Sequence, residues 1–224
     1  MNLTIDIGNT NQTYSYFNNK ELTIGSLAQL STDISMAKKI LVSSVNDDYL
    51  NLIPSPYISI KTLINNNQLL DMPINYTSTL GQDRSVLAYY LYKKYPGTSV
   101  IIDSGTFTTL DIVTKDGYQG GYILPGLEVL KQTYQAGTNL RSTSLDPIKK
   151  ESIPTSTSAA MSAGLMATFL YPLESIIQKI EAPRIFMTGG SATIIHNHFE
   201  QRPHIHYEKN LMHMALQFIA TEVF

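Results

Sequence analysis

The stretch "LTIDIGNTNQTYSY" at residues 3–16 contains the pattern that decides the fold. Apolar and polar residues alternate before Gly8-Asn9-Thr10 and again after it, which predicts two strands joined by a tight turn. Asp6 then lies near the end of the first strand, just before the turn. The following residues predict a third strand at 20–27, a helix at 28–39 and a further strand at 40–45.

The same pattern returns in "VIIDSGTFTTLDIVTKDGYQGGYILPGL" at residues 100–127. An apolar run ends in Asp103, Ser-Gly-Thr leads into a second strand, and Lys115-Asp116-Gly117 makes the turn to a third. Two copies of one strand-turn pattern predict a duplicated α/β fold. We expect two similar lobes, residues 1–97 and 98–224, whose turns face each other across a cleft that serves as the ligand site.

Turns of this kind suit phosphate. Glycine lets the backbone approach closely, successive N–H groups can point at one anion, and the hydroxyls of Thr10 and Thr106 add donors. A carboxylate repels phosphate unless a cation lies between them, so Asp6 and Asp103 indicate a nucleotide phosphate with metal. The alternative is structural, with each Asp in an Asx-turn and each Gly in a hairpin. P-loop and Rossmann motifs are absent from the sequence.

Composition favours a folded protein without polyanion partners. The 224 residues are 43% hydrophobic, enough to bury a core, and the formal charge of -2 gives no basic excess for nucleic acid or anionic lipid. The lack of cysteine excludes disulfides and thiolate metal sites. We expect a cytoplasmic protein with no membrane partner, because neither a secretory signal nor an apolar run near roughly 18 residues is seen. The charged fraction of 15% is low, which suggests a surface covered by a partner subunit.

Six blocks give a resemblance to a known family. In chain order they are "DIGNT" at 6–10, "GQDR" at 81–84, "DSGTFTTLD" at 103–111, "GGYILPGL" at 120–127, "TSAAMSAG" at 157–164 and "TGGSA" at 188–192. The chain resembles the type III pantothenate kinases of the acetate kinase, sugar kinase, Hsp70 and actin superfamily. The resemblance implies an actin-like ATPase fold of two ribonuclease H-like lobes. It also implies a homodimer that phosphorylates pantothenate to 4'-phosphopantothenate with ATP, the first step of coenzyme A biosynthesis.

The resemblance also implies a role for each matched residue. The residues that would bind ATP are Asp6, Ile7, Gly8, Asn9, Thr10, Asn11, Gln12, Thr13 and Thr106. The residues that would hold pantothenate are Gly81, Gln82, Asp83, Arg84 and Thr157. Asp83 would be the catalytic base, Asp103 would bind a monovalent cation (K⁺ or NH₄⁺), and Gly189-Gly190 would border the adenosine. Mg²⁺ would accompany the ATP.

The block at 81–84 also fits phosphoryl transfer by its residue types. Transfer to an alcohol needs a positioned hydroxyl, cations on the phosphates and a carboxylate to take the proton. Asp83 and Arg84 are adjacent, so one could reach the hydroxyl while the other pairs with a substrate carboxylate. The alternative is an exposed ion pair at the start of a helix over 85–95, with Asp83 near the N-cap.

Three features of the sequence have more than one interpretation. Phe107 stands where the family has a small residue, so its ring would either crowd the nucleotide pocket or pack beneath it. Tyr76 would line the pantothenate pocket or be an ordinary strand tyrosine. His196/His198 and His204/His206 are H-x-H pairs whose side chains, in strands, would point to one side as a metal site requires. The alternative for the histidines is a surface loop and a strand edge.

Two other functions stay open from the sequence. One is a non-catalytic relative that keeps the nucleotide fold as a regulatory or scaffolding module, since fold does not fix function. The retention of Asp6, Asp83, Arg84 and Asp103 together argues against it, since a degenerate copy has no need of all four. The other is a kinase of the same superfamily that acts on a sugar or on acetate, which only the substrate distinguishes.

Overall fold

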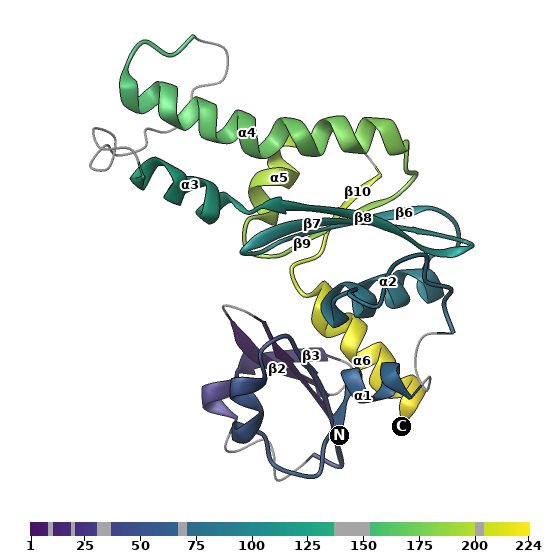
Figure 1. Cartoon of the computed structure of the whole chain (residues 1–224). Coiled ribbons are helices and arrows are strands. Elements are labelled where there is room, and N and C mark those ends of the chain that lie inside the picture. The colour runs from purple at the N-terminus through teal and green to yellow at the C-terminus, as the bar shows by residue number, and fades with distance from the viewer. Residues whose placement is uncertain (9–10, 19–20, 31–36, 67–70, 137–152, 200–203) are drawn as a thin grey trace.

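The computed structural model describes residues 1–8, 11–18, 21–30, 37–66, 71–136, 153–199 and 204–224. Within these residues the chain forms two five-stranded sheets, with helices between the sheets and over the far face of the second one (Figure 1).

The first sheet has the strand order β3-β2-β1-β4-β5, in which β1, β2 and β3 are antiparallel neighbours and β4 and β5 are added in parallel. The bounds are β1 Asn2–Ile7, β2 Gln12–Asn18, β3 Glu21–Ser26, β4 Lys39–Ser44 and β5 Ile58–Ser59. The predicted strands at 20–27 and 40–45 are confirmed. Of the helix predicted at 28–39, the described part contains only the 3-10 turn η1 Leu27–Gln29, and residues 31–36 lie outside the description. The prediction is wrong at Lys39, because this residue already pairs with Asn2 in the sheet.

The second sheet repeats the first strand by strand. Its order, β8-β7-β6-β9-β10, has the same antiparallel and parallel neighbours. The bounds are β6 Ser99–Ser104, β7 Phe107–Thr114, β8 Gly117–Pro125, β9 Ile185–Thr188 and β10 Ile205–Tyr207. Asp6 and Asp103 occupy equivalent positions, each next to last in the central strand of its sheet. The duplicated α/β fold predicted from the repeated pattern is confirmed.

Two helices fill the space between the sheets. α2 Gln82–Lys94 and α6 Leu211–Val223 pack on each other, and their buried side chains form one apolar cluster with Ile101, Val113 and Phe186 of the second sheet. α6 also packs on β1, β2 and β4 of the first sheet (Figure 1). The last helix of the chain therefore completes the first lobe, and the boundary near residue 97 stays a prediction.

Further helices and turns cover the remaining faces. α3 Leu127–Gln135, α4 Thr157–Ile180 and α5 Ala192–Phe199 lie over the far face of the second sheet, where they bury an apolar cluster with Val100, Ile102 and Leu110. In the first lobe, the outer face of β1 and β4 packs against η1 and against η3 Asp47–Leu52. α1 Ile60–Asn65 follows β5 and packs on β4. The predicted helix at 85–95 is confirmed as part of α2.

α4 is long and apolar enough, by length and composition alone, to cross a membrane. The sequence prediction that no run approaches such a length overlooked it, because scattered small and polar residues interrupt the apolar ones. One face of α4 is buried on the second sheet through residues such as Leu165, Phe169 and Leu173. Packing on the second sheet therefore accounts for the apolar residues of this buried face of α4.

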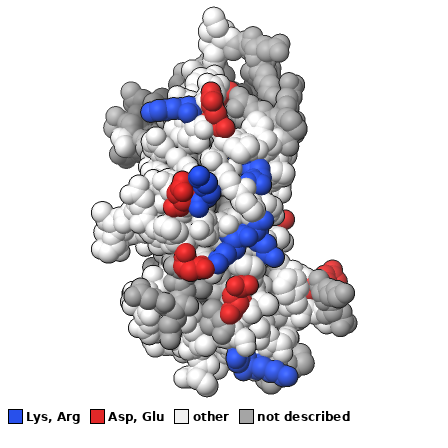
Figure 2. Space-filling view, turned by 90° about the vertical axis from the view of Figure 1, so that its right-hand side faces the viewer, with Lys and Arg blue, Asp and Glu red and all other residues white. Residues whose placement is uncertain are grey.

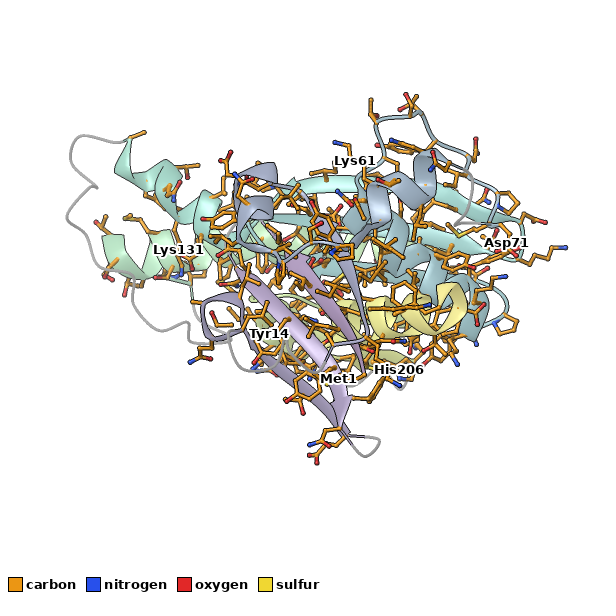
Figure 3. All side chains as sticks on the ribbon, turned by 90° about the horizontal axis from the view of Figure 1, so that it is seen from below. Met1, Tyr14, Lys61, Asp71, Lys131 and His206 are labelled. Atoms are coloured by element: carbon orange, nitrogen blue, oxygen red, sulfur yellow. The ribbon has the colours of Figure 1, made fainter. Side chains whose placement is uncertain are left out.

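The surface in Figure 2 is mostly uncharged, with cationic and anionic side chains interspersed. Two of the ion pairs in the structure are peripheral, Lys93 with Asp71 and Lys131 with Glu128. Asp71 and Lys131 lie toward opposite ends of the molecule (Figure 3). Exposed pairs of this kind contribute little to stability.

Candidate active site

The equivalent aspartates of the two central strands lie close to a third carboxylate. Burial, together with the charges of Asp103 and Asp83, raises the pKa of Asp6 from 3.8 to about 7. Burial, with the charges of Asp83 and Asp111, raises the pKa of Asp103 to about 6. Burial is the larger cause of both shifts, and the contribution of Asp83 to each of them indicates that it lies near both aspartates. Ionised together without a cation, they would repel one another strongly.

Asp83 is held at this position by the first turn of α2. Gln82 and Arg84 flank it, and residues two apart on a helix point to nearly opposite sides. The side-chain amide of Gln82 donates to the carbonyl oxygen of Ser44 at the end of β4. The guanidinium of Arg84 bonds to Asp111 on β7. The start of α2 thus contacts both sheets, with Asp83 between the two contacts.

The side chain of Asp83 is half-buried at the start of α2. Its Oδ1 accepts the backbone N–H of Arg84 at 2.8 Å, a local bond typical of a helix start. Burial nevertheless raises the pKa of Asp83 above its ordinary value, and the charge of Asp111 adds to the effect. A carboxylate with a raised pKa is a better proton acceptor, which suits a general base.

Arg84 and Asp111 form a buried ion pair, and both side chains are less than 10% exposed. Nε and Nη2 of Arg84 donate to Asp111 Oδ1 at 2.9 and 2.6 Å, and Nη2 also donates to the hydroxyl of Tyr118 at 2.8 Å. Tyr118 in turn donates to Asp111 Oδ1 at 2.6 Å. Burial opposes the charged form of Arg84, but its bond to Asp111 raises the pKa above the ordinary value. The exposed ion pair of Asp83 with Arg84, considered as an alternative from the sequence, is therefore not observed.

Sequence reasoning did not single out Asp111 or Tyr118. Asp111 lies in the middle of β7 between Leu110 and Ile112, opposite Ile101 of β6. Because side chains alternate along a strand, its carboxylate is on the same face as Asp103, toward α2. A charged residue between apolar neighbours within a strand was the available signal.

The turn after each central strand is closed by backbone hydrogen bonds. The N–H of Gly8 donates to Asn11 O at 2.9 Å, and the N–H of Gly105 donates to Phe107 O at 3.1 Å. Asn9 and Thr10, which the sequence assigned to ATP binding, lie outside the described residues. Thr106 is exposed at the second turn, as a group that meets a ligand must be.

Gly189 closes the second turn from the side of β9. Its φ is +93°, and a Cβ there would lie 2.5 Å from Asp103 Oδ1. Only glycine suits both the left-handed backbone and this close approach. The sequence placed Gly189-Gly190 beside the adenosine, and the structure places Gly189 against Asp103.

Thr13 on β2 is linked to the last helix. Its hydroxyl lies 2.9 Å from Nε2 of His213, whose ring is buried and whose pKa is lowered by burial to about 4. One turn further along α6, Gln217 donates to the hydroxyl of Thr4 and to the carbonyl of Ser15. A row of polar contacts thus joins α6 to the strands that carry the first turn. A lone histidine in an apolar helix gave no sequence signal for this link.

Thr157, expected to contact pantothenate, does not join the other substrate residues. It is exposed at the start of α4, on the opposite face of the second sheet from α2 (Figure 1). Tyr76 is 39% exposed and lies over Arg84, with its ring centre 5.4 Å from Cζ. Phe107 is 53% exposed, so its ring is not packed beneath the turn.

The four clustered histidines lie in two different elements of secondary structure, α5 and the segment of β10. His196 and His198 lie in α5, where residues two apart diverge, so the expectation of a strand was wrong for this pair. His206 lies in β10, and His204 lies just before it. Among the described residues no three His, Cys, Asp or Glu side chains gather as a metal site. Cations at Asp6 or Asp103 would therefore need other ligands as well, and phosphate and hydroxyl oxygens are suitable ones.

A cavity of about 690 Å³ lies on the Ser44 side of Gln82. Its walls come from the end of β4, from η3 and from the segment that forms β5 and α1, and they include Lys61. Lys61 projects from α1, away from Tyr14 on β2 (Figure 3). Oε1 of Gln82 is buried and has no hydrogen-bond partner among the residues that the structure describes.

Comparison with known structures supports the fold. A protein described as a Baf family transcriptional activator from Campylobacter jejuni is 24% identical, with a TM-score of 0.65 and coverage of 98% of both chains. A protein described as a 2-dehydro-3-deoxygalactonokinase from Sinorhizobium meliloti is 11% identical, with a TM-score of 0.63 and coverage of 100% of this chain and 97% of that one. Together with the two duplicated sheets, these similarities confirm the actin-like fold class expected from the sequence.

Comparison of sequences identifies the family. A type III pantothenate kinase from Phenylobacterium zucineum is 29% identical over 201 residues, which cover 85% of this chain and 77% of the relative. The model of the family described as type III pantothenate kinase matches residues 2–179, which include the strand-end aspartates and the start of α2. On this match, and with its site built from the family's blocks, the chain belongs to the type III pantothenate kinase family.

Proposed function

We propose that this chain transfers the terminal phosphoryl group of ATP to the hydroxyl of pantothenate, which yields 4'-phosphopantothenate. The observation that carries the proposal is that Asp6, Asp83 and Asp103 lie together between the sheets, where burial and then the charges of neighbouring carboxylates raise the pKa of Asp6 and Asp103. Repeated turns for phosphate and a separate carboxylate for the acceptor are the parts that phosphoryl transfer needs.

Asp83 is the proposed catalytic base. Its place at the start of α2 lies between the two lobes, and burial raises its pKa. The acceptor hydroxyl would give its proton to Asp83 as its oxygen attacks the phosphorus and the bond to ADP breaks. Gly81 supports this arrangement, because a Cβ there would lie 2.5 Å from Asp83 Oδ1.

The two turns are the proposed ATP site. The residues assigned to it from the first turn are Asp6, Ile7, Gly8, Asn9, Thr10, Asn11, Gln12 and Thr13, and Thr106 comes from the second. Mg²⁺ would neutralise phosphate charge beside Asp6, and a monovalent cation would do the same beside Asp103. The raised pKa of both aspartates fits this, since a cation would remove the electrostatic cost of ionising them.

A homodimer would explain the position of Thr157. This residue is on the far face of the second sheet from Asp83, so within one chain the two do not meet. A second copy could bring its own Thr157 to the substrate. The exposed apolar side chains of Tyr171 on α4 and Ile123 on β8 give such a contact apolar area. We place the enzyme in the cytoplasm, where ATP is available.

The test is an ATP-consumption assay with the purified chain and pantothenate, hexoses or acetate as acceptors. We expect ADP to form only with pantothenate, and mass spectrometry should find 4'-phosphopantothenate. Turnover of a hexose or acetate instead would assign a different kinase of the superfamily. ATP binding without turnover of any acceptor would favour a regulatory relative.

A further inference from the structure

Arg84 is expected to meet the carboxylate of pantothenate, yet in the structure it is already bound to another carboxylate. Asp111 accepts two of its N–H groups, and Tyr118 accepts a third. The pair is buried and carries no net charge. The charge of Arg84 alone would therefore add little to the binding of a substrate carboxylate. The direction in which the remaining N–H groups of Arg84 point then decides whether they can bind that carboxylate.

The three bonds all use one side of the planar guanidinium. They involve Nε and Nη2 and leave Nη1 outside these three bonds. Arg84 also has a hydrogen bond to the side chain of Tyr76, which helps to raise the pKa of the guanidinium. The ring of Tyr76 lies over this group at 5.4 Å from Cζ, and its own side chain is 39% exposed. Asp111 and Tyr118 thus hold the guanidinium within its own plane, and Tyr76, which borders solvent, lies over its face.

Tyr118 also holds the segment that carries Tyr76. Its backbone N–H donates to Pro73 O at 2.9 Å, and its carbonyl accepts the N–H of Asn75 at 2.9 Å. Gly117, with a φ of +98°, allows this contact, because a Cβ there would lie 2.1 Å from Pro73 O. One residue, Tyr118, therefore fixes both Arg84 and the segment above it, and its ring packs edge-on against Tyr76 at 5.7 Å.

We propose that Asp111 and Tyr118 are positioning residues that orient Arg84 so that Nη1 binds the carboxylate of the acceptor, which makes the enzyme selective for an acid over its neutral analogue. This inference rests on the proposed function. Neither residue touches the substrate. Both act through the orientation of Arg84, so their loss should weaken binding of the acid much more than binding of a neutral alcohol of the same shape.

A purely structural role would have a different signature. If the pair only joins α2 to β7, its loss should lower the unfolding temperature and reduce turnover of both acceptors equally. The cavity offers a second location for an acid, because Lys61 lines it on the other side of Gln82. Lys61→Met is therefore the matched control, since it removes a cation without touching Arg84.

The experiment measures kcat and KM for pantothenate and for its neutral analogue with CH₂OH in place of the carboxylate. The enzymes are the wild type, Asp111→Asn, Tyr118→Phe, Arg84→Met and Lys61→Met. Hydrogen bonds to charged groups are the stronger ones, so we expect the preference for the acid to fall roughly tenfold or more in Asp111→Asn and about threefold in Tyr118→Phe. The change should appear in KM, and KM for ATP should stay near the wild-type value.

Asp111→Asn leaves the buried Arg84 without its anion and could prevent folding, so Tyr118→Phe, which keeps the ring, carries the test in that case. In the Arg84→Met background, Tyr118→Phe should have no further effect on the preference, because the residue acts through Arg84. An equal loss for both acceptors in Tyr118→Phe would overturn the inference, as would a loss of preference in Lys61→Met. If the wild type phosphorylates neither acceptor, the proposed function itself fails.

Discussion

The two lobes share one topology but hold their equivalent aspartates differently. Asp6 is opposite Thr13 in the first sheet, and Thr13 is tied to His213 of the last helix. Asp103 is enclosed by its own lobe, with Gly189 packed against its carboxylate. The turn after Asp103 is also one residue shorter than the turn after Asp6. Duplication thus places two carboxylates symmetrically, and the local packing of each lobe gives them different surroundings.

This difference supports different partners for the two carboxylates. The first turn, residues 6–13, is the longer one, and its length suits phosphate and a divalent cation. The second is closed on three sides by β7, β9 and Gly126, whose N–H donates to Thr106 O. A closed site lined with backbone oxygens suits a weakly hydrated monovalent cation.

The largest effect on activity should come from substitution of Asp83, which lies at the start of α2 and outside both turns. Asp83→Asn should lower kcat by roughly two to four orders of magnitude, because the variant cannot accept the acceptor's proton. ATP affinity, measured by calorimetry, should stay close to that of the wild type. A variant with near-normal turnover would remove Asp83 from the role of base.

Gly189→Ala tests how tightly the second turn is closed. The new Cβ would meet Asp103 Oδ1 at 2.5 Å on a backbone with φ of +93°. We expect a loss of roughly 1–3 kcal/mol in unfolding free energy, seen as a lower midpoint in thermal unfolding.

Gly190→Ala is the matched control for that change. A Cβ at Gly190 would have no neighbour within 4 Å, so its effect should stay within about 0.5 kcal/mol. Equal destabilisation by the two substitutions would show that the contact with Asp103 does not constrain the turn.

Activation by a monovalent cation should depend on Asp103, and this would distinguish its role from that of Asp6. At constant ionic strength, replacing choline chloride by potassium chloride should raise the activity of the wild type. Asp103→Asn should reduce this activation and raise KM for ATP, by roughly tenfold or less, since single polar contacts are worth about 1 kcal/mol. Constant ionic strength excludes simple screening as the cause. Full activity of the wild type in choline alone would refute the cation site.

The smallest effect should be a pH dependence of stability without ligands. The pKa values of Asp6 and Asp103 are raised in the folded state, to about 7 and 6, so ionising these groups destabilises the fold. Their stabilising contribution is complete below the unfolded pKa near 3.8 and is lost as the pH rises through the folded values. Buried His213, with a pKa lowered to about 4, has the opposite sign and loses stability as the pH falls below about 6.5.

The comparison with Asp6→Asn isolates the aspartate from the histidine. Relative to the wild type, this variant should gain a few degrees in unfolding temperature at pH 8, and the gain should disappear toward pH 4. Adding Mg²⁺ and ATP should raise the wild-type midpoint more at pH 8 than at pH 6. A difference between the two proteins that does not change with pH would contradict the assignment of the raised pKa to Asp6.

Several parts of the site were accessible from sequence because they depend on local pattern. Alternation of apolar residues followed by Asp-x-Gly predicted both central strands and both turns, and the block at 81–84 predicted the start of a helix. The roles of Thr157, Gly189 and Arg84 were less accessible. Each depends on contacts between distant parts of the chain. Thr157 lies on the other face of the second sheet. Gly189 packs against Asp103, and Arg84 pairs with Asp111.

By itself the sequence determined the duplicated α/β pattern and the equivalence of Asp6 and Asp103, because strand alternation and turn residues are local properties that recur when the sequence recurs. Only the tertiary structure decided that the last helix returns to the first lobe and ties Thr13 through His213. It also decided that Arg84 is bound by Asp111, some 27 positions away. Such contacts follow from burial of apolar faces shared by distant segments, and each segment's own sequence leaves its partner undetermined.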